Sequence, residues 1–381
     1  MNRPILAIET SCDETAAAVI ARTADPARPW TLLSSIVASQ TEIHREWGGV
    51  VPELASRQHV RDICGVVEAA LEKSGVAASR LSAIAVTQGP GLVGSLLVGV
   101  AFAKSYAWSR GLPVVPVHHL AGHIESLVLA HGELPLPSAV LVVSGGHTSL
   151  YFIPEAGRYQ LVGRTRDDAA GEAYDKVAKL LGLGYPGGPV IDRLAREGNE
   201  RAYDFPAARL THADRNAPQP TAPTGLLPPD VARRVDFSFS GLKTAVLRLV
   251  RDLTGMPARG KAADADALGA ALTGQQAADI AASFQRVVVT VLLDRTFEAA
   301  RWLGAQSIGI SGGVSANSRL RAEADARSAQ YGIPVFVPPL SLSTDNAAMI
   351  GAAAMRLMDK GNAGDDYGFN AEASLALGSY G

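Results

Sequence analysis

The chain contains one order of strands and helices twice, and this repetition limits the possible folds more than any single motif does. In the first half, apolar runs and helical periodicity predict strands at 5–9, 16–20 and 32–37, helix 52–73, strand 83–87, helix 95–109 and strand 114–117. The second half repeats the order with strands 139–143, 148–153 and 159–164, a helix near 171–181, strand 307–310, helix 316–331 and strand 335–337. We therefore predict an α/β protein with a duplicated βββαβαβα unit.

Two such units form two lobes with a cleft between them, because ligands of α/β sheets bind beyond the carboxyl ends of the strands. We expect residues 1–118 and 346–381 to form the first lobe, with the C-terminal helix packing back onto it. Residues 119–345 form the second lobe, with surface insertions near 206–229 and 259–274.

Glycine-rich turns follow strands in both halves. Ser144-Gly145-Gly146 and Ser311-Gly312-Gly313 expose backbone N–H groups that a phosphate can approach closely, and a third turn runs from Gln88 to Gly94. Each turn alone fits a plain tight turn equally well. Three of them in one duplicated frame favour a nucleotide-binding cleft.

Composition narrows the class of protein only slightly. A length of 381 residues with 47% hydrophobic content is enough for two cores, and a net charge of −2 provides no general attraction to nucleic acid. Two cysteines exclude a disulfide framework. Met1 to Ile20 lacks the pattern of a signal peptide, and the apolar helix at 95–108 is too short to span a bilayer, so we expect a cytoplasmic protein without a membrane anchor.

The segment from Arg201 to Lys261 is locally basic, with ten Lys and Arg against five Asp residues. One interpretation is a contact with nucleic-acid phosphates, made by Arg233, Arg234, Lys243 and Arg248. The other is an ordinary solvated surface of mixed charge.

His119 and His123 provide the strongest chemical signal. Their spacing places two imidazoles on one helical face, where they can share a metal ion or serve as two ordinary polar residues. Asp345 follows the last strand of the second unit, as His119 follows the last strand of the first. We therefore expect Asp345 as a third ligand from the opposite lobe, so that a metal bridges the two lobes; its alternative role is a helix N-cap.

Two histidines and a carboxylate suit Fe(II) or Zn(II). A zincin protease requires Glu directly after the first His, where this chain has Leu120, so proteolysis is disfavoured.

At this level of detail the chain resembles the bacterial TsaD/Gcp family of tRNA N6-adenosine threonylcarbamoyltransferases. The shared motifs span residues 5 to about 355 in the family's order. They are Ile8–Thr15, Gly48–Arg57, Gly89–Gly94, His119–His123, Val143–Thr148, Asp167–Glu172, Phe237–Lys243, Ile310–Asn317 and Ser343–Asn346. Among small departures, Ala121 stands where many relatives carry an acidic residue.

The resemblance implies the actin/sugar kinase/Hsp70 fold and a specific reaction. The threonylcarbamoyl group of threonylcarbamoyl-AMP passes to N6 of adenosine 37 in tRNAs that read ANN codons. It further implies one iron ion on His119, His123 and Asp345, with zinc as an alternative in vitro. The adenylate, or ATP or ADP, is expected to contact Val142, Val143, Ser144, Gly145, Gly146, Asp175, Gly188, Asp192 and Asn317. A smaller TsaB-like paralogue and a TsaE-like ATPase are the implied partners.

Asp13 and Glu14 match acidic residues that the family needs for activity. Because the acyl group is already activated, no covalent intermediate is required, and a carboxylate that accepts the amine proton is useful. Their alternative role is to order the loop by hydrogen bonds. A kinase-like or Hsp70-like ATPase and a nucleotide-gated scaffold would share the fold, but neither explains the His-His-Asp set.

Overall fold

The chain divides into two compact units, called unit 1 and unit 2. Unit 1 consists of Met1–Pro135, Glu155–Tyr159 and Pro338–Gly381, and unit 2 of Leu136–Pro154 and Gln160–Val337. The computed structural model describes residues 3–207, 235–255, 265–361 and 367–377. Most of the predicted insertion 206–229, the start of the insertion 259–274, and Arg233 and Arg234 lie outside the described residues.

Unit 1 contains a five-stranded sheet in the order β3-β2-β1-β4-β5. β1, β2 and β3 pair antiparallel, whereas β1, β4 and β5 pair parallel. The bounds are β1 Ile5–Glu9, β2 Glu14–Arg22, β3 Trp30–Ser39, α1 Thr41–Arg45, α2 Pro52–Ser74, η1 Ala78–Arg80, β4 Ile84–Gly89, α3 Val93–Trp108, β5 Val114–His118, α4 His119–His131, α13 Leu340–Ser343 and α14 Ala347–Asp359.

Unit 2 repeats this topology. Its sheet has the order β10-β9-β6-β7-β8, with β6, β7 and β8 antiparallel and β6, β9 and β10 parallel. The bounds are β6 Ser138–Val143, β7 Thr148–Ile153, β8 Gln160–Arg164, α5 Ala170–Leu180, α6 Gly187–Leu194, η2 Ala195–Glu197, α9 Ser240–Thr254, α10 Ala265–Ala270, α11 Gly274–Trp302, β9 Ser307–Ser311, η5 Gly313–Ala316, α12 Ser318–Tyr331 and β10 Val335–Phe336. The predicted duplicated α/β fold is confirmed.

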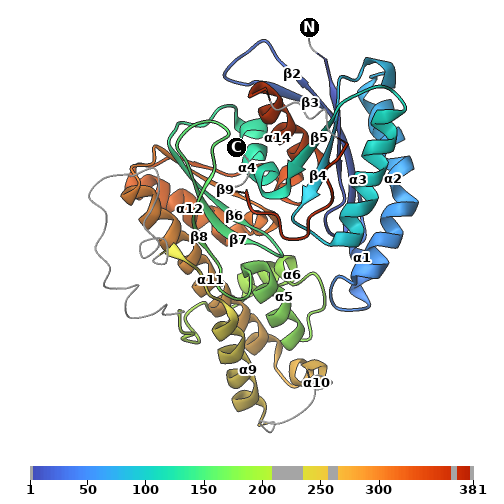
Figure 1. Cartoon of the computed structure of the whole chain (residues 1–381). Helices are drawn as coiled ribbons and strands as arrows, with labels where there is room; N and C mark the ends of the chain where they lie inside the picture. The colour runs from blue at the N-terminus through green and yellow to red at the C-terminus, as the bar shows by residue number, and fades with distance from the viewer. Residues whose placement is uncertain (1–2, 208–234, 256–264, 362–366, 378–381) are drawn as a thin grey trace. The chain divides into compact units, whose positions relative to one another are not determined.

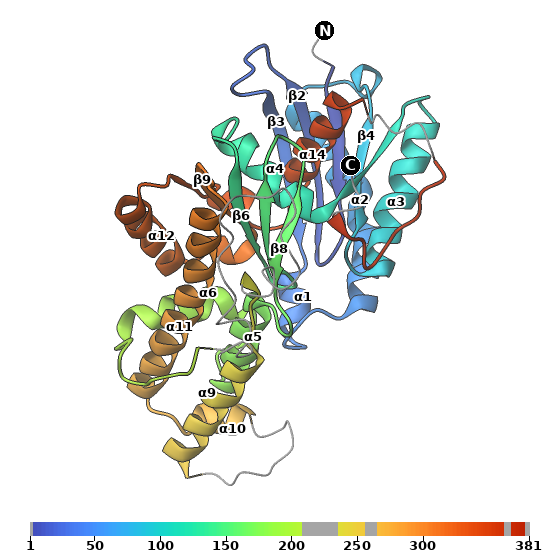
Figure 2. The ribbon, with the colours of Figure 1, turned by 60° about the vertical axis from the view of Figure 1, so that its left-hand side comes forward.

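Helices cover both faces of the unit 1 sheet, which explains the unbroken apolar sequence of its central strand. Leu6 and Ile8 of β1 pack in a core with residues of α2 and α3. On the other face α14 packs against β1 and β2 so closely that a Cβ at Gly351 would lie 2.8 Å from Ile20 and 3.3 Å from Ala7. Figures 1 and 2 show α14 and α4 together against the sheet. All five residues of β1 are consequently buried.

The long helix α11 forms the centre of unit 2. Phe284, Val288 and Leu292 lie in the same core as Leu141 of β6 and Ile310 of β9. α11 is long and apolar enough to span a membrane, but 67% of its apolar window is buried inside the protein, as expected of a core helix.

The insertion predicted at 259–274 is not wholly a surface excursion. Its residues Ala265–Ala270 form α10, which packs against α5. Leu268 is buried in the unit 2 core, and a Cβ at Gly269 would lie 2.5 Å from the backbone of Leu181. The Ala/Gly-rich composition suggested an irregular loop, whereas these small residues allow a close helix contact.

Candidate functional site

α4 begins where β5 ends, so its first residue stands at the carboxyl end of a parallel strand. His118 ends β5, and its Nδ1 accepts the backbone N–H of Leu120 at 3.1 Å, which caps the helix. His119 and His123 follow on one face of α4, one turn apart, with ring centroids separated by 4.8 Å. The two imidazoles lie together, as their spacing predicts.

Asp345 lies in the short connection between α13 and α14 and faces both histidines. Its Oδ1 is 3.6 Å from His119 Nε2 and 3.2 Å from His123 Nε2. One ligand atom from each of the three residues lies within 4.8 Å of the others. Asp345 is not the cap of α14, because Asn346 fills that role by accepting the backbone N–H of Met349 at 3.0 Å.

The three residues belong to one unit, so the expectation that a metal bridges the two lobes is wrong. The chain leaves unit 2 at Val337, and Pro338–Gly381 is part of unit 1, as is all of α4. The repeat placed Asp345 in the second lobe by analogy with His119. The analogy fails because α14 completes the far face of the first sheet and keeps Asp345 in unit 1. The boundaries accordingly differ from the expected 118/119 and 345/346.

Glu9, at the end of β1, orients His119. Its Oε2 lies 3.1 Å from His119 Nδ1 and accepts the hydroxyl of Thr87 at 2.7 Å, while Oε1 accepts the backbone N–H of Ser11. A carboxylate on Nδ1 holds a proton there, so Nε2, which faces Asp345, is the ring nitrogen that can bind a cation. The Ala121 side chain on α4 has no polar group that could orient a metal ligand, and Glu9 of β1 orients His119 instead.

The donor set fits a divalent metal ion. His123 is fully buried: among the described residues its Nδ1 makes no hydrogen bond, and its Nε2 faces Asp345 Oδ1 at 3.2 Å. Burial lowers the pKa of His123, so its ring is neutral. Burial opposes the charge on His119 as well, but the Asp345 and Glu9 carboxylates raise its pKa to about 9, so a metal ion that binds Nε2 displaces a proton from it. Two buried imidazoles facing one carboxylate oxygen can hold a metal such as Fe(II) or Zn(II).

Asp13 ends the connection from β1 to β2 in the same unit, and Glu14 is the first residue of β2. Asp13 is buried and Glu14 is half-buried. Burial raises the pKa of Glu14 well above its ordinary value, and the negative charges of Asp13 and Asp345 raise it further. The hydroxyl of Ser39 donates to Glu14 Oε1 at 3.3 Å. Glu14 is therefore a carboxyl group whose proton affinity is increased first by burial and then by the neighbouring carboxylates.

The predicted phosphate loops lie next to each other in unit 2. Val142 and Val143 end the buried strand β6, and Gly145 and Gly146 are exposed at the turn that follows, where an added Cβ would meet no atom within 4 Å. Gly312 follows β9 with φ +91°, and a Cβ there would lie 2.4 Å from the carbonyl oxygen of Val143. Only glycine fits at that contact.

Two hydroxyl groups of the second loop are buried without a partner. Ser311 and Ser315 flank Gly312-Gly313, and among the described residues neither Oγ makes a hydrogen bond. Buried hydroxyls normally have a partner, so an acceptor of hydrogen bonds such as a phosphate oxygen suits this loop.

The remaining residues that we predicted to bind the nucleotide also make hydrogen bonds at helix starts in unit 2. Asp175 accepts the backbone N–H of Gly187 at 2.7 Å, and Gly188 follows in open space at the start of α6. Asp192 accepts the hydroxyl of Ser318 at 2.9 Å, and Asn317 caps α12 by accepting the N–H of Leu320 at 3.0 Å. Asp192 and Asn317 therefore meet at the start of α12.

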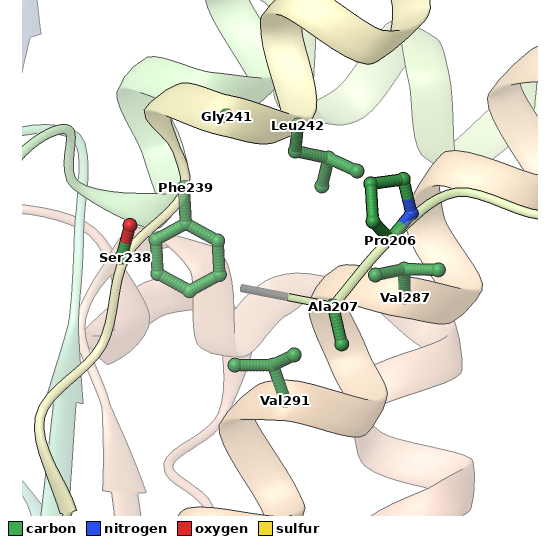
Figure 3. A pocket seen from close by; sticks show the side chains of 8 residues that line it. All are labelled: Pro206, Ala207, Ser238, Phe239, Gly241, Leu242, Val287 and Val291. Atoms are coloured by element: carbon green, nitrogen blue, oxygen red, sulfur yellow. The ribbon is translucent and has the colours of Figure 1, made fainter. Parts of the chain in front are cut away.

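The pocket shown in Figure 3 lies apart from these residues. It has a volume of about 290 Å³ and lies between the start of α9 and α11, with Phe239 and Leu242 facing Val287 and Val291. A second cavity, of about 790 Å³, lies between α2 and α3. No predicted site residue lines either cavity.

Comparison with known proteins identifies the family. The family "TsaD: tRNA N6-adenosine threonylcarbamoyltransferase" matches residues 31–352. The tRNA N6-adenosine threonylcarbamoyltransferase of Anaeromyxobacter dehalogenans (strain 2CP-C) is 50% identical over 98% of this chain and 99% of its own length. This chain belongs to that family. The proteins of the same name from Moorella thermoacetica and Koribacter versatilis are 49% identical over 92% of this chain and 48% identical over 98%, covering 90% and 98% of their own lengths.

The threonylcarbamoyltransferase family assignment makes the chain a transferase that acts in tRNA modification. The fold comparison agrees with it. Full-length HypF, solved in its phosphate- and nucleotide-bound form, superimposes with a TM-score of 0.53 at 14% identity, over 95% of this chain and 56% of HypF. At that identity the likeness shows the fold alone, which is the predicted actin/sugar kinase/Hsp70 type.

Sequence reasoning missed two residues of this chain that support the candidate sites. Glu9 stands at the end of a predicted strand, and no sequence pattern around it relates it to His119. Asp167 accepts the backbone N–H groups of Phe239 and Ser240 at 2.8 and 3.2 Å and so caps α9 from a distant loop. Its place in the matched motif Asp167–Glu172 was the available signal.

Proposed function

We propose that this chain transfers the threonylcarbamoyl group of threonylcarbamoyl-AMP to N6 of adenosine 37 in tRNAs that read ANN codons, forming t6A. The family match over residues 31–352, together with the buried His119 and His123 and the half-buried Asp345, supports this proposal. In the reaction a C–N bond forms between N6 and the carbamoyl carbon, the carbamoyl–phosphate bond breaks, AMP leaves, and N6 loses a proton.

Unit 2 residues bind the nucleotide part of the donor in this proposal. The backbone N–H groups at Gly145, Gly146 and Gly313 and the hydroxyls of Ser311 and Ser315 hold phosphate oxygens, and no side chain at the three glycines obstructs their approach. The other contacts to the adenylate come from Val142, Val143, Ser144, Asp175, Gly188, Asp192 and Asn317. ATP or ADP binds to the same loops.

Unit 1 residues supply the acid–base chemistry. Glu14, with Asp13 beside it, accepts the proton that N6 loses, because a carboxylate with a raised pKa is a better base near neutral pH. His119, His123 and Asp345 hold one Fe(II) ion, or zinc in vitro, and Glu9 fixes the ring of His119. When bound, the metal supplies Lewis-acid stabilisation of negative charge.

We further propose, from the family resemblance, that the protein works in the cytoplasm with a smaller TsaB-like paralogue and a TsaE-like ATPase. Incorporation of labelled threonine and bicarbonate-derived carbon into unmodified tRNA, with these helpers present, tests the proposal. Label is expected at adenosine 37 of ANN-reading tRNAs and absent from tRNAs that read other codons. ATP hydrolysis that proceeds without label in tRNA would instead indicate a kinase-like or Hsp70-like ATPase.

A further inference from the structure

Three buried polar side chains form a connected path behind the loop that carries Asp13 and Glu14. Gln40 follows β3, His44 lies on α1 and His59 lies on α2, and all three are at most 1% exposed. The proposed mechanism uses none of them. Buried polar groups in this number are costly unless each is satisfied, so their arrangement requires an explanation.

The hydrogen positions on His59 follow from its partners. The backbone carbonyl of Cys12 lies 3.0 Å from His59 Nε2 and can only accept, so Nε2 carries the proton. Nδ1 then accepts from the hydroxyl of Thr15 at 2.8 Å and from Gln40 Nε2 at 3.3 Å. Burial lowers the pKa of His59 and keeps this neutral tautomer in place.

The rest of the path runs in the same direction. Gln40 Nε2 also donates to the carbonyl of Ala55 at 3.3 Å, so its Oε1 is left to accept from His44 Nε2 at 3.2 Å. His44 Nδ1 accepts the backbone N–H of Val51 at 3.2 Å. Every donor between Val51 and Cys12 therefore meets an acceptor. Moving the proton of either imidazole to its other nitrogen would place a donor against a donor.

The path ends on the backbone of the proposed catalytic carboxylates. His59 donates to the carbonyl of Cys12, and the backbone N–H of Gln40 donates to the next carbonyl, that of Asp13, at 3.0 Å. Two consecutive peptide groups are thus each held by a hydrogen bond. Adjacent carboxylates repel each other, so a loop that presents both needs such fixed support.

We propose that His59 is a positioning residue that holds the Cys12–Asp13–Glu14 backbone in the geometry needed for transfer, with Gln40 and His44 fixing its tautomer. This inference depends on the proposed function of Asp13 and Glu14. A purely structural role would lower stability but leave the turnover of folded protein unchanged. A positioning role lowers kcat in folded protein and leaves KM for tRNA nearly unchanged.

Matched substitutions at His59 separate these roles. In His59→Gln the amide nitrogen reaches the position of Nε2 and can donate to Cys12, whereas in His59→Asn it reaches only Nδ1. We expect kcat to fall on the order of 10- to 100-fold in His59→Asn, because small misplacement of reacting groups has effects of that size. His59→Gln should recover most of this loss, and bound metal should stay the same in both variants.

A milder substitution and a measurement other than activity test the same role without a large change in the core. Thr15→Val removes only a donor to Nδ1, and we expect a loss in kcat of about two- to tenfold. Amide hydrogen exchange of residues 11–15 should accelerate in His59→Asn and return toward the wild-type rate in His59→Gln.

Four outcomes decide between these roles. Wild-type kcat in folded His59→Asn, or wild-type exchange of residues 11–15 in that variant, would overturn the positioning role. The same holds if His59→Gln is no better than His59→Asn by either measure. The catalytic proposal itself is tested by the double variant Glu14→Gln, Asp13→Asn, whose full activity would refute it. If amide exchange is still faster in His59→Asn, the support of the loop by His59 would nevertheless be established.

Discussion

Adjacent residues at the start of α14 have separate tasks, and this allows a sharp test of the metal centre. Asp345 Oδ1 lies 3.6 and 3.2 Å from the Nε2 atoms of His119 and His123. Asn346, the next residue, caps the helix through the N–H of Met349. Asp345→Ala should therefore remove a metal ligand and leave the cap, whereas Asn346→Ala should remove the cap and leave the ligands.

The two substitutions should change different quantities: Asp345→Ala the metal affinity, and Asn346→Ala the free energy of unfolding. Loss of a residue that only hydrogen-bonds to a metal ligand lowers metal affinity about 10- to 100-fold. Loss of the only carboxylate in the set should cost at least about 100-fold in Kd, or about 2.7 kcal/mol. For Asn346→Ala we expect a decrease of about 1 kcal/mol in the free energy of unfolding, typical of a lost N-cap, with the metal Kd almost unchanged.

The assay combines metal analysis after dialysis, anaerobic titration with Fe(II) and Zn(II), and denaturant unfolding of the metal-free proteins. Asp345→Asn is the matched control, since it keeps the size of the side chain and removes its charge. Full metal occupancy in Asp345→Ala would refute the ligand assignment. Loss of metal from Asn346→Ala at unchanged stability would show that the two tasks were assigned to the wrong residues.

Three further predictions concern other parts of the chain. Glu9→Gln should weaken metal binding about 10- to 100-fold in the same titration, because His119 loses the carboxylate that orients its ring; an unchanged Kd would contradict this. Asp167→Asn should lower the free energy of unfolding by about 1 kcal/mol at neutral pH. Burial opposes ionisation of Asp167, but hydrogen bonds from Ser238, Phe239 and Ser240 outweigh it and lower the pKa of this carboxyl. Its contribution is therefore present above the ordinary Asp value of about 3.9 and is lost as pH falls through the lowered pKa; a difference that persists at pH 2 would count against the cap. Finally, if Lys243 and Arg248 on α9 contact tRNA phosphates, replacing both with Gln should reduce the salt slope of tRNA binding by about 2, whereas an equal slope would favour the plain surface interpretation.

Much of the fold could be predicted because local patterns and tertiary burial agree. The strand Ile5–Glu9 was predicted to the residue, since burial on both faces requires an unbroken apolar run. The predicted helix 52–73 matches α2 closely, because Pro52 opens it and Gly75, at φ +65°, ends it.

The helix α11 was not predicted, although Thr273 and Gln276 form a capping box at its start. Its burial on most sides weakens the amphipathic periodicity on which helix prediction depends.

The candidate site was predictable only where its residues are close in sequence. His119 and His123 are related by one helical turn, so their spacing was informative. Glu9 is 110 residues from His119, and no local pattern relates a strand end to a ring nitrogen that far away. Asp345 was assigned to the set but to the other lobe, because the repeat shows which strand it follows and not which sheet the final helix covers.

The central claim is that this chain itself transfers a threonylcarbamoyl group to tRNA. The most direct measurement supplies preformed threonylcarbamoyl-AMP and unmodified ANN-reading tRNA to the protein together with the proposed TsaB-like partner, followed by mass spectrometry of the digested nucleosides. The account predicts t6A, dependent on this chain, and none on a tRNA that carries guanosine at position 37. Unmodified adenosine after complete consumption of the donor, or equal transfer to the guanosine variant, would contradict it.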